Sequence, residues 1–345
     1  MTPEAEPNSR PAERRPLISQ KNAWPLLALL VVLNFNIYFT KGFADLQVKD
    51  GRLFGSTVDV AHRGSIVMLL ATGMTLVIAT AGIDLSVGAV MAIAGAVSAL
   101  LLTRTGLPVP VVAAIAVGVA LGAGLWNGML VASLRLQPIV ATLILLVAGR
   151  GIAQLLTDGQ IITFENPQFE FIGTGSLLGL PVTVFVVAFV VGVTLLLTKK
   201  AVAGLYIEAV GGNESAARLA GLRPGLVKML VYGFSGLCAG VAGLIATADI
   251  KAADINNCGL YLELDAILAV VIGGTAFSGG RANIVGSILG ALIMQTLTTT
   301  ILMRGVGVEY TLVVKAVAVI AVCLLQSERF RAATFGRLVR RGQTA

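Results

Sequence analysis

The side chains that usually perform catalysis are scarce in this sequence. His62 is the only histidine, and the three cysteines, Cys238, Cys258 and Cys323, are widely spaced. Disulfide frameworks, metal sites and nucleophilic catalytic sites need such side chains in close sets. The sequence therefore predicts no catalytic residue, no metal site and no cofactor bound by this chain.

Nucleotide hydrolysis is not expected of this chain either. The segment 277–281 (FSGGR) resembles the signature loop of ABC ATPases. However, the sequence contains no Gly-Lys dipeptide, so it has no GxxxxGK[ST] loop to hold nucleotide phosphates. If ATP drives this protein, the ATP and Mg bind to another chain.

Polar residues inside apolar sequence are the candidates for solute binding. Asp84 lies with Ser86 in the motif GIDLSVG, and a carboxylate near hydrocarbon usually faces protein or water. We favour Asp84 as a cap for the helix that follows, accepting from the N–H of Ser86 or Val87; a solute contact is the alternative. Asn127, and the segment 137–142 (QPIVAT), supply amide and hydroxyl groups that would suit a hydroxyl-rich solute. Such groups equally satisfy broken backbone in lipid.

A polar break at 208–222 (EAVGGNESAARLAGL) predicts a short helix outside the bilayer. Asn213 can cap its first turn, Glu214 suits the positive end of the helix dipole, and Gly221 suits the left-handed position that ends a helix. Pro224 prevents its continuation. One interpretation of this break is an ordinary loop between helices. The more specific interpretation is a helix that a cytoplasmic partner pushes like a lever.

The elements that must position these residues are membrane helices. Of 345 residues, 56% are hydrophobic and 12% are charged, against about a quarter charged in soluble domains. Ten spans of about 20 residues would account for the hydrophobic share. We predict an all-α polytopic membrane protein with about ten transmembrane helices. The predicted spans are 24–39, 64–80, 87–103, 109–126, 139–156, 181–198, 227–248, a short one at 265–273, 284–302 and 310–325.

The distribution of charge predicts the orientation. The net charge is +7, but the basic residues cluster at the two ends and in short loops, so the positive-inside rule explains them better than nucleic-acid binding does. Ten spans place both termini and the loop 199–226 in the cytoplasm and the acidic segment 157–180 outside. We expect a disordered tail at 1–22, a membrane domain at 23–326 and a basic tail at 327–345. That tail either lies on the membrane or is solvated.

Three further patterns concern packing and charge. A weak parallel repeat relates the segments that begin at Leu76 and Ala269, although any Gly-rich polytopic protein can look self-similar. Small residues predict close helix packing, in a GxxxG motif at 286–290 and at Gly118, Gly122 and Gly124. Arg150 and Lys315 lie within spans and either extend to the interface or pair with a carboxylate such as Asp265.

Four motifs, in order, carry a resemblance to a known family. They are 73–96 (GMTLVIATAGIDLSVGAVMAIAGA), 137–151 (QPIVATLILLVAGRG), 208–222, and 264–292 (LDAILAVVIGGTAFSGGRANIVGSILGAL). Over residues 24–326 the chain resembles permease subunits of ribose- and galactofuranose-type sugar ABC importers. It departs from the family at 276–278 (AFS), where a leucine and another small residue are common.

The resemblance implies a multi-pass protein of the cell inner membrane that does no covalent chemistry. It implies several partners: a cytoplasmic ABC ATPase, a second permease (the same chain or a homologue), a periplasmic sugar-binding protein and membrane lipid. The helix at 213–222 is similar to a coupling helix. The implied ATPase-coupling residues are Glu208, Gly212, Asn213, Glu214, Ala216, Ala217, Arg218 and Gly221. The candidate translocation-pathway residues are Asp84, Ser86, Asn127, Gln137, Thr142, Gly273, Gly274 and Thr275.

Three alternatives stay open at this point. A branched-chain amino-acid or nucleoside ABC permease would share the architecture. An ion-coupled secondary transporter would need no ATPase. An intramembrane enzyme would need a nucleophile or metal cluster within its spans, which one histidine and scattered cysteines do not favour.

Overall fold

The computed structural model describes residues 20–49, 51–305, 307, 310, 312–317, 320 and 324. In these residues the chain is helical, with strands only in three short pairs, which confirms the all-α class. The N-terminal tail up to residue 19 and the basic tail 327–345 lie outside the described residues, as do seven of the 16 residues of the span predicted at 310–325. The number of spans and the side of the membrane on which each terminus lies stay predictions.

The helices follow one another with short connections. They are α1 (Gln20–Phe39), α2 (Ser56–Ala79), α3 (Val87–Arg104), α4 (Val109–Ala132), α5 (Pro138–Leu156), α6 (Pro167–Thr174), α7 (Val182–Lys199), α8 (Val202–Gly212), α9 (Glu214–Leu219), α10 (Pro224–Ile250), α11 (Leu262–Ile272) and α12 (Ile284–Met303). The strands pair antiparallel: β1 (Gln47–Lys49) with β2 (Arg52–Phe54), β3 (Ile162–Thr163) with β6 (Ala252–Ala253), and β4 (Ser176–Leu177) with β5 (Leu180–Pro181).

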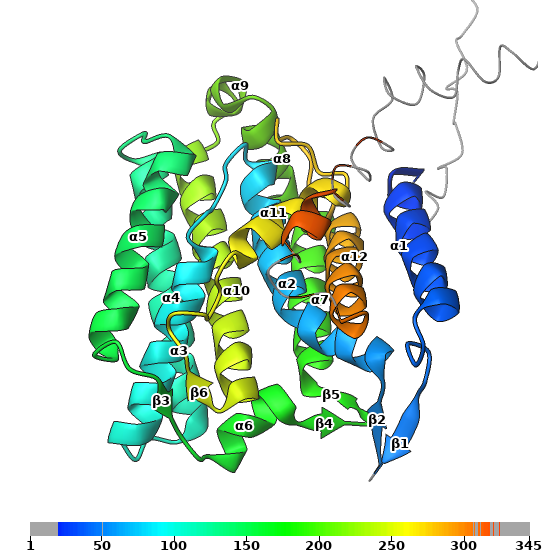
Figure 1. The fold of residues 1–345 in the computed structure, drawn as a ribbon. Helices are drawn as coiled ribbons and strands as arrows, with labels where there is room; N and C mark the ends of the chain where they lie inside the picture. Colours follow the sequence, from blue (N-terminus) through cyan, green and yellow to red (C-terminus); the bar gives the residue numbers. More distant parts are fainter. Residues whose placement is uncertain are drawn as a thin grey trace, which may run out of the picture.

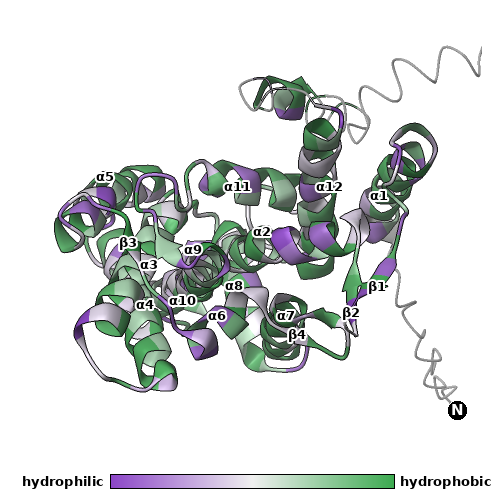
Figure 2. Ribbon diagram, turned by 60° about the horizontal axis from the view of Figure 1, so that its bottom comes forward, coloured by the Kyte–Doolittle hydropathy of each residue, from purple (hydrophilic) through white to green (hydrophobic). Residues whose placement is uncertain are grey.

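Eight helices in the described part of the chain are long and apolar enough to cross a membrane: α1, α2, α3, α4, α5, α7, α10 and α12. Each corresponds to a predicted span. The largest boundary error is at α2, which begins at Ser56 rather than 64, because its first two turns carry Asp59, His62 and Arg63. Figure 2 shows the apolar colour dominating these long helices, with hydrophilic colour gathered in connecting segments and at a few helix positions.

Two short helices, α11 and α8, differ from what the sequence predicts. The span predicted at 265–273 is part of α11, whose 11 residues extend about 16 Å at ~1.5 Å per residue, too short for a ~30 Å hydrocarbon core. Helix α8 was not predicted, because the segment 199–226 was expected to contain one short helix, at 213–222. Its sequence VAGLYIEAVGG is apolar, so the prediction failed on length rather than on composition.

Helix α10 forms the centre of the bundle and packs against α4, α2 and α3 (Figure 1). Close packing through small residues is confirmed for Gly124, where a Cβ would overlap the carbonyl oxygen of Tyr232 on α10. It is also confirmed for Gly286 and Gly290, which face α11 and the turn after it. Gly118 and Gly122 do not pack in this way within the described part of the chain, where a Cβ on either would meet no atom within 4 Å.

The two ends of the bundle differ. Helix α9 projects from one end, whereas α6 and the small strand pairs lie at the other (Figure 1). The acidic segment 157–180 is therefore opposite the segment 199–226, which is the relative placement that the ten-span topology requires.

Each half of the chain contains a helix, a Gly-rich break and a second helix: α2, 80–86 and α3 in one, and α11, 273–283 and α12 in the other. The backbone N–H of Gly280 in the second break donates to the carbonyl of Ala79, at the start of the first break (2.9 Å). The start of α3 also meets the segment before α11, where a Cβ on Gly88 would overlap the backbone of Gly259, and the reverse holds as well. The two breaks thus lie together, and the first half also touches the second half before α11.

Candidate functional site

Helix α9 has the capped form that its sequence predicts. The side-chain oxygen of Asn213 accepts a hydrogen bond from the backbone N–H of Ala216 at 2.9 Å, while Asn213 itself is extended. After Leu219 the chain turns at Gly221, whose φ of 86° is the left-handed conformation that glycine adopts most easily. Pro224 then begins α10. The sequence specifies both ends of this short helix.

Charged side chains fasten α9 to α10. The carboxylate of Glu214 accepts from Lys228 Nζ on α10 at 2.5 Å and from Arg218, one turn along α9, at 3.2 Å. The hydrogen bond from Lys228 is the largest cause that holds the pKa of Glu214 below its usual range, and it acts against partial burial. The bond to Arg218 is exposed and contributes little stability. The link to Lys228 is the one that fixes α9.

The two alanines proposed for ATPase coupling have different environments. Ala217 is buried against the rest of the chain, whereas Ala216 and Arg218 are exposed. Leu219, which was not among the predicted coupling residues, is 91% exposed at the end of α9. A bulky residue at Ala217 would therefore disturb the packing of α9 itself, and the outward surface for a partner consists of Ala216, Arg218 and Leu219.

The end of α8 joins α9 to the two Gly-rich breaks. A Cβ on Gly211 would overlap the carbonyl oxygen of Ala79 and crowd the N–H of Gly280, so the three backbones are in direct contact. Glu208 Oε1 accepts weakly from the N–H of Ala282 in the second break, at 3.4 Å. Glu208 and Gly212, both predicted coupling residues, thus lie beside the break that contains the predicted pathway residues 273–275.

The second break is a turn rather than an open surface. Gly274 takes a left-handed φ of 82°, and the Thr275 hydroxyl accepts from the N–H of Asn283 at 3.3 Å. Asn283 in turn caps α12 by accepting from the N–H of Gly286 at 3.2 Å. Phe277, in the segment that departs from the family pattern, is exposed at the tip. The polar groups of the break mainly satisfy one another.

Three of the predicted pathway residues come together in the interior. Asp84 Oδ1 accepts from the N–H and the hydroxyl of Ser86 at 3.0 and 2.6 Å, and Asn127 donates to that hydroxyl at 2.8 Å. Asp84 Oδ2 accepts from Ser235 of α10 at 2.9 Å. The predicted bond from the Ser86 N–H is confirmed, although Ser86 rather than Asp84 takes the capping position of α3. All four side chains are buried, so they form a closed junction of α3, α4 and α10.

Other residues near this junction have different roles. Thr142 is buried and bonds mainly to the carbonyl of Pro138 one turn back, at 2.9 Å. Gln137 is exposed at the start of α5 and lies apart from the junction. Tyr232 donates to the carbonyl of Ile83 at 3.2 Å and, like Ser235, was missed by the sequence analysis. Their spacing of three on α10, in the run VYGFSG, places them on one helix face and was the available signal.

The two basic residues within spans both bind protein groups. Lys315 Nζ lies 2.8 Å from Asp265 Oδ2, and both side chains are largely buried. Arg150 donates to the carbonyls of Ile255 and Cys258 at 3.0 and 2.5 Å. The pairing alternative therefore describes Lys315, whereas Arg150 binds backbone carbonyls.

These features, apolar spans, broken helices and a projecting capped helix, can be compared with known families. The family described as "Branched-chain amino acid transport system / permease component" matches residues 56–323. The chain belongs to this permease family. It is a membrane-spanning transport component rather than a catalyst.

Several permeases named for sugars are similar over nearly the whole length. The permease is 51% identical, over 96% of both chains, to the galactofuranose transporter permease protein YtfT of Escherichia coli (strain K12). It is 39% identical to the fructose import permease protein FruF of Bifidobacterium longum, over 91% of this chain and 89% of that one. It is 36% identical to the ribose import permease protein RbsC of E. coli (strain K12), over 91% and 95%.

Proposed function

We propose that this permease is the membrane subunit of an ABC importer for a monosaccharide, with galactofuranose as the first candidate and ribose or fructose next. Support comes from the three relatives above, each of which is named for a sugar. The 51% identity to the galactofuranose permease covers 96% of both chains. The family description also mentions branched-chain amino acids, so a permease for those is the second candidate. The chain is a multi-pass protein of the cell inner membrane.

In this proposal the end that carries α9 faces the cytoplasm and meets an ATPase that binds ATP and Mg. A second permease completes the pathway, and a periplasmic binding protein delivers the sugar. The ATPase can drive transport only if its nucleotide states have different affinities for two forms of the permease. The ATPase would bind the exposed surface of α9, which consists of Ala216, Arg218 and Leu219.

The contact of Gly211 with Ala79 and Gly280 is the observation that carries this mechanism. Because three backbones touch there, a displacement of α8 and α9 must displace the ends of α2 and of the second break. Those breaks lead into α3 and α12, so the motion would reach the interior without passing through a flexible loop. In this mechanism the junction of Asp84, Ser86 and Asn127 is part of what must rearrange.

The test is reconstitution of the permease in proteoliposomes with a candidate ATPase, second permease and periplasmic binding protein from the same organism. We expect uptake of a labelled sugar that requires ATP. Uptake by the permease alone would support an ion-coupled transporter and overturn the proposal. Binding of a branched-chain amino acid or nucleoside, and not a sugar, to the binding protein would change the substrate class. Accessibility labelling of a cysteine at position 218 should find it on the cytoplasmic side.

A further inference from the structure

A cavity of about 240 Å³ lies at the end of the bundle opposite α9, between α2, α10 and α12. It contains none of the predicted pathway residues. Its polar lining is His62, Arg63, Asp249, Gln295 and Thr298, and its apolar lining is Ile66, Ile245 and Leu302.

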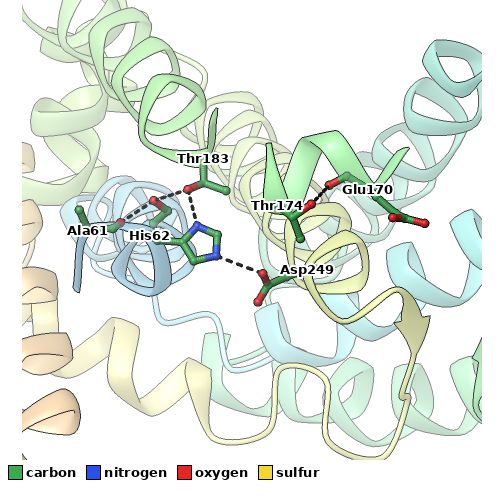
Figure 3. Close-up of polar contacts among 7 residues, drawn as sticks. Ala61, His62, Glu170, Thr174, Thr183 and Asp249 are labelled. Atoms are coloured by element: carbon green, nitrogen blue, oxygen red, sulfur yellow. Dashed lines mark hydrogen bonds and ion pairs between the residues drawn. The ribbon is translucent and has the colours of Figure 1, made fainter. Parts of the chain in front are cut away.

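A hydrogen-bonded histidine organises one wall of this cavity. The ring of His62 lies between Thr183 of α7 and Asp249 of α10, as Figure 3 shows. Its Nδ1 lies 3.1 Å from Thr183 Oγ1, and its Nε2 lies 3.1 Å from Asp249 Oδ1. Ser65, one turn along α2, extends the chain by donating to Thr183 Oγ1 at 3.3 Å. His62 of α2 thus holds the Asp249 carboxylate, and Thr183 of α7 in turn holds the His62 ring.

Several polar groups on the cavity wall have spare hydrogen-bonding capacity. Asp249 uses Oδ1 for His62, and no described residue donates to its Oδ2. Gln295 is nine-tenths buried, and its amide nitrogen reaches Thr299 at a long 3.4 Å, while no described residue donates to its amide oxygen. Arg63 is exposed and forms no ion pair within the described chain. Two acceptors and a donor therefore face one space.

The size and chemistry of the cavity select the class of ligand. A volume of about 240 Å³ is below the range of about 300–1,000 Å³ typical of sites for drug-sized molecules, so only a small solute fits. Carboxylate, amide and guanidinium groups can bind several hydroxyls at once. Ile66, Ile245 and Leu302 offer an apolar wall to the C–H groups of a ring.

We propose that this cavity binds a monosaccharide, through Asp249 and Gln295, where the sugar first meets the permease. The proposal rests on the proposed function and adds to it the residues of an access site. His62 is a positioning residue in this site because it holds Asp249 and need not touch the sugar.

The test compares two cavity variants with two matched controls. Asp249→Asn and Gln295→Leu each remove one acceptor. Glu170→Gln removes a carboxylate at the same end of the bundle, where it pairs with Lys251 at 2.7 Å, and Gln154→Leu removes an amide that bonds to Asn256 at 3.1 Å. Neither control residue lines the cavity. Uptake of labelled D-galactose (which supplies the furanose form), D-ribose and D-fructose is measured in the full transport assembly, with the ATPase rate measured in parallel.

Each cavity variant should raise the sugar concentration for half-maximal uptake about tenfold, the effect of one lost hydrogen bond to a charged or buried group. The ATPase rate without sugar and both control variants should stay at wild-type values. Wild-type half-saturation in both cavity variants would overturn the inference. If Asp249→Asn does not fold, Gln295→Leu decides alone.

A second measurement separates this inference from the proposed function. Saturation-transfer NMR with D-galactose, D-ribose and D-fructose is recorded on the full permease in nanodiscs, without partners. Signals that weaken in the cavity variants, and not in the controls, support the site even if the assembly imports no sugar. Equal signals in all five proteins, or no signal from wild type, would overturn it.

Discussion

Gly280 and Ala79 are joined by a backbone hydrogen bond of 2.9 Å, although they belong to different halves of the chain. Gly211, at the end of α8, packs on both of them. Three segments that lie far apart in the sequence therefore meet beside the base of α9. A force applied to α9 reaches both Gly-rich breaks through backbone atoms, which cannot yield by changing rotamer.

The first prediction concerns this contact. Gly211→Ala should lower stability by about 1–3 kcal/mol, the usual effect of overpacking, and should reduce uptake more than it reduces yield. The added methyl group would overlap the carbonyl of Ala79 and displace the second break. Thermal unfolding in detergent and uptake in the full assembly measure the two effects.

The neighbouring glycine supplies the control. A Cβ on Gly212 would come no closer than 4.0 Å to another residue, Gly280, so Gly212→Ala should keep wild-type stability. Equal behaviour of the two variants would show that the three-way contact does not matter.

The second prediction concerns the exposed tip of α9. Leu219→Ser should weaken co-purification of the ATPase by about tenfold while leaving yield and melting temperature unchanged, because this side chain makes little contact within its own chain. Leu178→Ser is the control. Leu178 is 88% exposed, similar to Leu219, but lies at the other end of the bundle. Loss of the ATPase in both variants, or in neither, would argue against α9 as the docking element.

The third prediction concerns pH. The pKa of Glu214 is lower in the folded protein than its ordinary value of about 4.5, chiefly because Lys228 donates to it. The stabilisation of α9 is therefore present above about pH 4.5 and is lost as the pH falls through the lower, folded pKa. Amide hydrogen exchange of 214–220, corrected for intrinsic rates, should show protection dropping a few-fold on acidification.

Glu214→Gln should show the reduced protection already at pH 7. The control Glu170→Gln, which breaks the pair with Lys251 at the far end, should leave α9 unchanged. Protection of α9 that is the same in wild type and Glu214→Gln at pH 7 would show that the bond to Lys228 does not hold the helix.

The fourth prediction concerns the pair of Lys315 and Asp265. Lys315→Met leaves a carboxylate largely buried without its partner, so it should destabilise the fold by about 3 kcal/mol and lower yield or uptake. Combining it with Asp265→Leu should recover much of the stability, because no charge is then stranded. Unchanged yield and uptake in Lys315→Met would mean that the pair is dispensable.

Much of the fold follows from local sequence. Long apolar runs give the spans, and the residues Asn213, Gly221 and Pro224 define both ends of α9, because caps and turns depend on near neighbours. The predicted starts of helices are less accurate, as at α2. Charged residues such as Arg63 were taken to lie before the helix, but they are helical residues at the polar end of the bundle. Helix α8 was missed because its 11 residues, although apolar, are too few for a span.

The sites depend on contacts between distant segments, and prediction was weaker there. Asp84, Ser86 and Asn127 do meet, but Gln137 lies apart, because helix rotation and depth decide which polar group faces inward. The cavity beside His62 was not anticipated. A lone histidine in one helix and Asp249 at the end of another carry no joint pattern, and only the packing of α2 on α10 brings them together.

The contact between Gly88 and Gly259 bears on how this chain can change over generations. Any side chain at either position would overlap the backbone opposite, so neither half can gain bulk there by itself. A larger side chain at one position cannot be offset by a smaller one at the other, since glycine is already the smallest residue. We therefore expect both positions to stay glycine in descendants of this chain, with sequence changes at other positions.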